Sequence, residues 1–396
     1  MRTPVVLAAP HRAFFLAGLI MLNVGMATWL ASRAGLLPRA ISGLDHAFII
    51  SHGALAFFIF GFLLTVFPRW LDRPPIPRRW YAAASVTMIL GTLALLAGLV
   101  LLRVLVLPGL VVIGAGWLIG FVALAGVLLR TEKTVLHAQA VLPALLLGFA
   151  SLVAYALWHI SGTWQWVFLA NNLALWLFLA PIFLAVSHRM IPFFSHSALD
   201  NYQMYRPAAL LWLLIVGCCV HFVLAMLHRH DWLWLADLPM AAIGLRLWWR
   251  WRPHRSRGIA LLRSLFVAYA WFFIATLMFA AQSLWYQFDG NFVFGRAPVH
   301  ALTIGFFTSM AIAMVTRVAL GHSGRPLRMH RWQWLVLLAV QTSALVRIAA
   351  EWPGIETSTA NTLISAGAWL WLAALVPWAA YFVWVCATAR IDGEPG

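Results

Sequence analysis

Histidine is the residue type that could do most chemistry in this chain, which contains 14 of them. Imidazole is the commonest ligand for haem iron and copper near neutral pH. Five histidines lie in or beside apolar stretches, toward the same expected side of a helical bundle: His46, His52, His159, His221 and His300. These five histidines are the candidate metal ligands. The alternative is that they form only hydrogen bonds within the protein.

His52 is the sharpest of the five candidates. It lies about five residues, or roughly 7–8 Å at 1.5 Å per residue, inside an otherwise apolar helix. A neutral imidazole at that depth needs a partner, and a metal ion is one. Gly53 and Gly61 on the same helix would allow a flat macrocycle, or equally another helix, to approach closely.

The composition places these histidines in a membrane protein. Of the 396 residues, 63% are hydrophobic and only 10% are charged, whereas a soluble domain carries roughly 25% charged residues. Most of the outer surface must therefore face lipid. The net charge of +16 does not indicate nucleic-acid binding, because the basic residues separate by membrane side and are not gathered on one soluble face.

Runs of about 20 apolar residues, the length that crosses a bilayer core, predict an all-α protein with twelve transmembrane helices. We expect the whole chain, 1–396, to form a single polytopic domain. The predicted spans are 14–32, 47–67, 81–102, 104–129, 134–158, 165–187, 208–227, 232–249, 260–285, 298–316, 333–350 and 361–387, joined by connections of which 188–207 is the longest.

The distribution of basic residues predicts the direction of the spans. With the N-terminus in the cytoplasm, Arg2 and most other basic residues fall on the inner side. The basic residues left outside are Arg33, Arg39, Arg103, Arg229, Arg296 and Arg347. This asymmetry follows the positive-inside rule and predicts that both termini are cytoplasmic.

Three of the predicted helices end in related motifs. These are LLTVFPRW at 63–70, LAVSHRMIP at 184–192 and AMVTRVALG at 313–321. They lie four helices apart, which suggests three four-helix units and resembles the plan of haem-copper oxidases. His52 and His300 then occupy the outer halves of helices 2 and 10, as the haem ligands do in that plan.

A second arrangement puts the chemistry at the inner ends of the same helices. Arg317 and the segment GHSGRP at 321–326 could form an anion site from guanidinium and backbone N–H groups. A haem on this side would take His322 as its ligand and leave His300 structural. Asp237, in the eighth predicted span, is either a buried hydrogen-bonded carboxylate or part of a proton relay.

Four segments carry a resemblance to a known family. They are PHRAFFLAGL at 10–19, HGALAFFIFGFLLTVFPRW at 52–70, HRMIPFF at 188–194 and VHALTIGFFTSMAIAMVTRVALGHSGRPL at 299–327. In this order they resemble the motifs of the NnrS family. The family commonly has His-Ala-His-Glu before helix 2, whereas here Phe48 and Ile49 follow His46 and Ala47.

The resemblance implies a bacterial inner-membrane protein of the nitric-oxide response, in nitrosative-stress protection or denitrification. It implies a b-type haem, held non-covalently because the chain has no C-x-x-C-H motif, and copper. Either another ligand such as His52 replaces the missing family histidine, or the protein holds one metal fewer. Expected partners are membrane lipids, nitric oxide or a related small molecule, and a redox partner. Whether the protein is an enzyme stays open. A twelve-helix transporter and an assembly partner of a nitric-oxide reductase are the alternatives.

Overall fold

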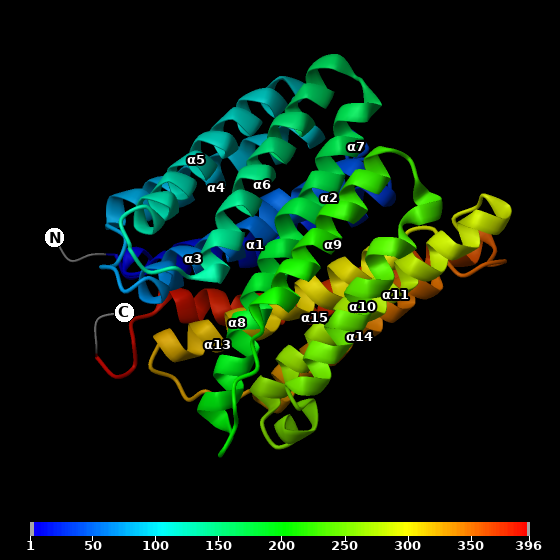
Figure 1. Cartoon of the computed structure of the whole chain (residues 1–396). Coiled ribbons are helices and arrows are strands. Elements are labelled where there is room, and N and C mark those ends of the chain that lie inside the picture. Colours follow the sequence, from blue (N-terminus) through cyan, green and yellow to red (C-terminus); the bar gives the residue numbers. More distant parts are fainter. Residues whose placement is uncertain (1–3, 394–396) are drawn as a thin grey trace. The chain divides into compact units, whose positions relative to one another are not determined.

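A computed structural model describes residues 4–393, and in this range the chain is helical apart from short connections (Figure 1). Arg2, expected on the inner side, lies outside the described residues. Twelve continuous helical stretches follow one another: α1 (Pro10–Arg33), α2–α3 (Gly43–Trp70), α4 (Arg78–Val100), α5 with its leading turn (Arg103–Leu128), α6 (Leu136–Ser161), α7–α8 (Trp164–Ala198), α9 (Ala208–Met226), α10 (Trp234–Arg250), α11 (Ala260–Asp289), α12–α13 (Ala297–His322), α14 (Arg331–Ala349) and α15 (Thr357–Ala387).

The all-α membrane class predicted from the sequence is confirmed. Eleven of the described helices are long and apolar enough to cross a membrane. The exception is α10, which has 17 residues and carries Asp237 in its first turn.

Two predicted boundaries differ from the structure for identifiable reasons. The second helix begins at Gly43 because Ser42 and Asp45 form a reciprocal capping box at its start. The sixth helix does not end at 187 but continues through the predicted connection to Ala198. In that extension Ile191, Phe194 and Ser195 are buried at helical spacing, so one face of the extra turns packs against the protein.

Three π-helical segments interrupt the long helices at a regular interval. Ser51–Leu55, Leu173–Leu179 and Ala301–Thr308 lie in the second, sixth and tenth helical stretches. A π-helical turn makes i→i+5 bonds and is frequent at functional sites. The side-chain hydroxyl of Thr308 also spans five residues, because it donates to the carbonyl oxygen of Thr303 at 3.0 Å. The four-helix interval matches that of the three motifs in the sequence.

The chain divides into two compact units. The first comprises Met1–Ile182, Val318–Pro326 and Ala379–Gly396, and the second comprises Phe183–Arg317 and Leu327–Trp378. In the first unit α4 packs on α5 and α5 on α6, as Figure 1 shows. The backbones of α4 and α5 approach each other closely because Gly91 and Gly109 have no side chain at the contact. A Cβ atom at either position would meet backbone atoms of the opposite helix. In the second unit α10 packs on α9 and α11.

Candidate functional site

Two histidines from distant parts of the sequence meet at one end of the first unit. His11 lies in the first turn of α1, which begins at Pro10, and His322 is the last residue of α13. Their ring centroids are 4.5 Å apart and the rings are tilted by 43°. His11 is only 1% exposed, and its backbone N–H donates to Thr65 Oγ1 on α3 at 3.1 Å. His322 is partly exposed.

Arginines surround this pair. Arg12 Nη1 donates to the carbonyl oxygens of Cys386 and Thr388, at the end of α15, at 3.2 and 2.6 Å. The guanidinium of Arg325 lies 4.7 Å from the Trp384 ring centre. Two further arginines are close enough to act electrostatically on His322. We call the whole set the basic cluster: His11, Arg12, Arg69, His322, Arg325 and Arg390.

Three nitrogen atoms of the basic cluster are buried without a hydrogen-bond partner among residues 4–393. They are His11 Nδ1, Arg12 Nε and Arg325 Nη1. A buried polar atom left in this state costs about 1–3 kcal/mol, so a ligand that supplies partners would be stabilised here. Imidazole is a haem ligand, and guanidinium groups pair with carboxylates such as the two propionates of haem. The side chains of the basic cluster therefore fit a haem.

The surroundings of His52 are different, because both ring nitrogens already have protein partners. His52 lies in the π-helical segment Ser51–Leu55 and is fully buried. Its Nε2 is 3.1 Å from the carbonyl oxygen of Gly148, and its Nδ1 is 2.8 Å from Ser51 Oγ. In the neutral ring Nε2–H donates to the carbonyl, and Nδ1 accepts from the hydroxyl.

Aromatic rings also cover His52. The Phe48 ring is nearly parallel to it, with centroids 4.4 Å apart, and the Trp117 centroid is 5.4 Å away. Phe48 in turn stacks on Tyr155 at 3.8 Å. To bind iron, His52 would have to give up a hydrogen bond and open this stack. The residues around His52 therefore do not fit a haem as they stand.

His46 and His159 lie in the same unit as His52, around a buried carboxylate. Tyr155 donates to Asp45 Oδ1 at 2.6 Å, and His159 Nε2 is 3.9 Å from the same oxygen. The His46 ring stacks on Trp29 with centroids 4.8 Å apart. In this arrangement the Asp45 carboxylate links α2 to α6 through its hydrogen bond with Tyr155.

The second unit contains the other predicted residues. His221 Nδ1 on α9 is 2.7 Å from Asp237 Oδ1 on α10, and the two side chains are 3% and 0% exposed. Asp237, which has no evident partner in the sequence, is thus a buried partner of a histidine. His300 Nδ1 lies 2.9 Å from the carbonyl oxygen of Arg296, and the Arg317 guanidinium lies 3.8 Å from the Phe194 ring centre.

The predicted ligands are therefore divided between the units. His46, His52, His159 and His322 belong to the first unit, and His221, His300 and Arg317 belong to the second. In the part of the chain that the structure describes, no three side chains of His, Cys, Asp or Glu come close enough together to hold a metal ion. The described residues therefore do not fit a copper site.

Sequence analysis missed His11 and Arg12 as site residues, although both stand in the quoted PHRAFFLAGL segment. The available signal was a His-Arg pair directly after a proline at the start of an apolar helix. Basic residues at the start of a membrane helix can serve only to orient that helix. The role of His11 and Arg12 therefore became visible only from the contact of α1 with the ends of α13 and α15.

Comparison with known proteins supports the resemblance. A search of curated proteins finds no match to the chain. A family model described as NnrS protein matches residues 5–390, nearly the whole chain. The twelve helical stretches and the basic cluster all lie within that match, and the chain belongs to the NnrS family.

Proposed function

We propose that this chain is a haem-binding protein of the bacterial inner membrane that interacts with nitric oxide, and that its haem is bound at the basic cluster. The observation that carries the proposal is the contact of His11 with His322 among arginines, with three buried nitrogen atoms left without partners. From the charge pattern we expect this end of the first unit to face the cytoplasm.

His322 is the residue that we expect to bind the iron. It is the more exposed of the two imidazoles. Arg12 is already fixed by the carbonyl oxygens of Cys386 and Thr388. This leaves its Nε available for a carboxylate, and Arg325 Nη1 is available in the same way. The arginines would thus neutralise the two propionates.

The distance between the histidines favours one protein ligand rather than two. Two imidazoles on opposite faces of one haem need ligating nitrogens roughly 4 Å apart, twice a metal–nitrogen bond of about 2 Å, and ring centres farther apart still. The observed centroids are only 4.5 Å apart. His11 therefore lies beside His322, and we expect His322 to hold the iron and His11 to orient His322. Bound haem would supply an iron atom that can bind nitric oxide.

Copper is not part of this proposal, because the described side chains do not form a group that could hold it. The alternative functions predict other outcomes in the same experiment. A transporter would move its substrate without any metal, and an assembly partner would act through a second protein.

The test is an optical spectrum and a metal analysis of the full chain purified in detergent, oxidised, reduced and exposed to nitric oxide. We expect a Soret band, a haem-to-protein ratio near one, and a shift of the band on adding nitric oxide. Folded protein from haem-replete cells that shows no Soret band would contradict the proposal and make transport the function to test.

A further inference from the structure

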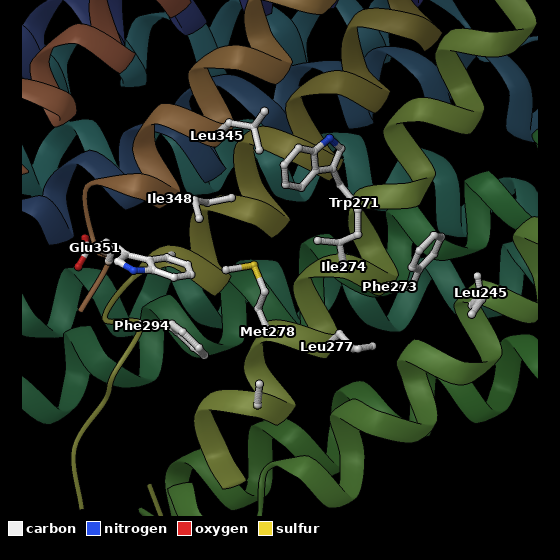
Figure 2. Close-up of a pocket in the computed structure, with 13 residues that line it drawn as sticks. Leu245, Trp271, Phe273, Ile274, Leu277, Met278, Phe294, Leu345, Ile348 and Glu351 are labelled. Carbon is white, nitrogen blue, oxygen red and sulfur yellow. The ribbon is translucent and has the colours of Figure 1, made fainter. Parts of the chain in front are cut away.

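The second unit has an apolar groove between α10, α11 and α14 that the proposed function does not use. Its volume is about 790 Å³, and its lining includes Ile274, Leu277 and Met278 of α11 with Leu345 and Ile348 of α14. Figure 2 shows the α14 side chains facing those of α11, and Phe294 and Glu351 together at one end. Several of these side chains are exposed: Ile274 by 38%, Leu277 by 47% and Leu345 by 56%.

The length of the groove matches one leaflet of a bilayer. Its lining on α11 runs from Trp271 to Ala281. Ten helical steps at 1.5 Å correspond to roughly 15 Å, which is half of a hydrocarbon core about 30 Å thick. An occupant that fills the groove therefore has an apolar part about one leaflet long.

One end of the groove carries a carboxylate, whose arginine partner lies outside the lining. Glu351 is the one charged residue in the lining, and its Oε1 accepts from Arg347 Nη2 at 2.6 Å. Gly295 has φ +46°, and a Cβ there would clash with the Glu351 carboxylate, so the glycine leaves room for this acid at the end of the groove. The neighbouring indole of Trp352 is 63% exposed, as is common at a membrane–water interface.

We propose that this groove binds one acyl chain of a zwitterionic phospholipid, with the headgroup at the Arg347–Glu351 pair. The apolar lining and its one-leaflet length fit a hydrocarbon chain. The Glu351 carboxylate at the end of the groove fits the ammonium of such a headgroup. An anionic headgroup has no ammonium to place there, so the site favours a zwitterionic lipid. This groove is separate from the basic cluster, and lipid binding here does not depend on haem.

Native mass spectrometry of the full chain tests the occupant. The purified protein is delipidated and then titrated with phosphatidylethanolamine or phosphatidylglycerol. We expect one phosphatidylethanolamine to be retained, with at least tenfold preference over phosphatidylglycerol. No retained lipid, a preference for phosphatidylglycerol, or an isoprenoid quinol held in its place would each overturn the proposal.

A matched pair of substitutions locates the lipid. Leu277→Trp fills the groove, whereas Leu284→Trp adds the same bulk on the same helix outside the lining, at a side chain that is 39% exposed. We expect Leu277→Trp to weaken phosphatidylethanolamine binding at least tenfold and Leu284→Trp to change it less than twofold. Equal binding by the two variants would overturn the location, and a melting curve checks that both variants are folded.

A third variant tests the headgroup. Glu351→Gln removes the negative charge and keeps the shape, so the lipid should still bind while its preference for phosphatidylethanolamine over phosphatidylglycerol falls severalfold. An unchanged preference in this variant would show that the Arg347–Glu351 pair does not select the headgroup, and the zwitterionic part of the proposal would be wrong.

Discussion

The imidazoles of His11 and His322 lie against each other, with ring centres 4.5 Å apart, although one begins the first helix and the other ends α13. The contact joins the PHRAFFLAGL segment at 10–19 to the GHSGRP segment at 321–326. A structural role for Arg12 explains part of this arrangement, because its guanidinium caps the end of α15. It does not explain why His11 Nδ1, Arg12 Nε and Arg325 Nη1 are buried without partners. A ligand at this end accounts for all three.

The backbone around His52 should tolerate no added bulk. A Cβ atom on Gly148, whose carbonyl accepts from His52, would lie 2.6 Å from a ring carbon of Trp117 and 2.8 Å from one of Phe178. We expect Gly148→Ala to lower the free energy of unfolding by about 1–3 kcal/mol, as overpacked cores do. Thermal unfolding in detergent, followed by circular dichroism, measures the effect.

Gly126→Ala is the matched control, because a Cβ there meets nothing within 4 Å. Alanine is the better helix former by roughly 0.5–1 kcal/mol, so this variant should be as stable as the wild type or more so. If the two variants melted at the same temperature, the close packing around His52 would not be present in solution.

The hydrogen bond between Tyr155 and Asp45 should contribute measurably to stability. Tyr155→Phe removes a 2.6 Å bond to a buried carboxylate, and bonds to charged groups contribute about 1.5–3 kcal/mol. The melting temperature should fall accordingly. Tyr286→Phe is the comparison, since no hydrogen bond of the Tyr286 hydroxyl is found in residues 4–393. A loss of equal size in both variants would rule out a special role for the Asp45 contact.

How far the sequence predicted this fold depends on how local each feature is. Apolar runs predicted all twelve helical stretches, because a membrane-spanning helix is a run of consecutive apolar residues that can be recognised in the sequence. The boundary between α4 and α5 near Arg103 was also correct. The sixth helix was predicted too short because Ser187, His188 and Arg189 interrupt its apolar run. The buried face that Ile191, Phe194 and Ser195 share beyond them exists only in three dimensions.

The candidate site was less predictable for the same reason. The sequence indicated His322 and the arginine-bearing motif ends as candidate site residues. It did not indicate His11, whose contact with His322 depends on the packing of α1 against α13. His52 is buried in its helix, but it lies nine residues after the helix start at Gly43 and not five. Its partners are a neighbouring serine and the carbonyl oxygen of Gly148 on another helix. Backbone acceptors cannot be recognised in a sequence. The sequence also could not predict that Asp237 and His221 are partners, because the helical periodicity of a sequence does not relate positions on two different helices.

The His221–Asp237 pair should show the cost of an unmatched buried charge. His221→Phe leaves the Asp237 carboxylate without its 2.7 Å partner in a fully buried position. Removing one member of such a pair costs about 3–5 kcal/mol. Asp237→Asn keeps an oxygen that can accept from His221 Nδ1–H, so its melting temperature should fall less. The reverse order of the two melting temperatures would show that His221 is not the partner that stabilises Asp237.

The most direct test of the haem site is the haem content of four histidine variants purified in parallel, read from the Soret absorbance per protein. His322→Ala should lose at least nine-tenths of the bound haem, and His11→Ala should lose a large part of it. His52→Ala should keep its haem, as should His254→Ala, a control at an exposed loop position. Normal haem in His322→Ala together with its loss in His52→Ala would contradict the account and assign the haem to the other end of the first unit.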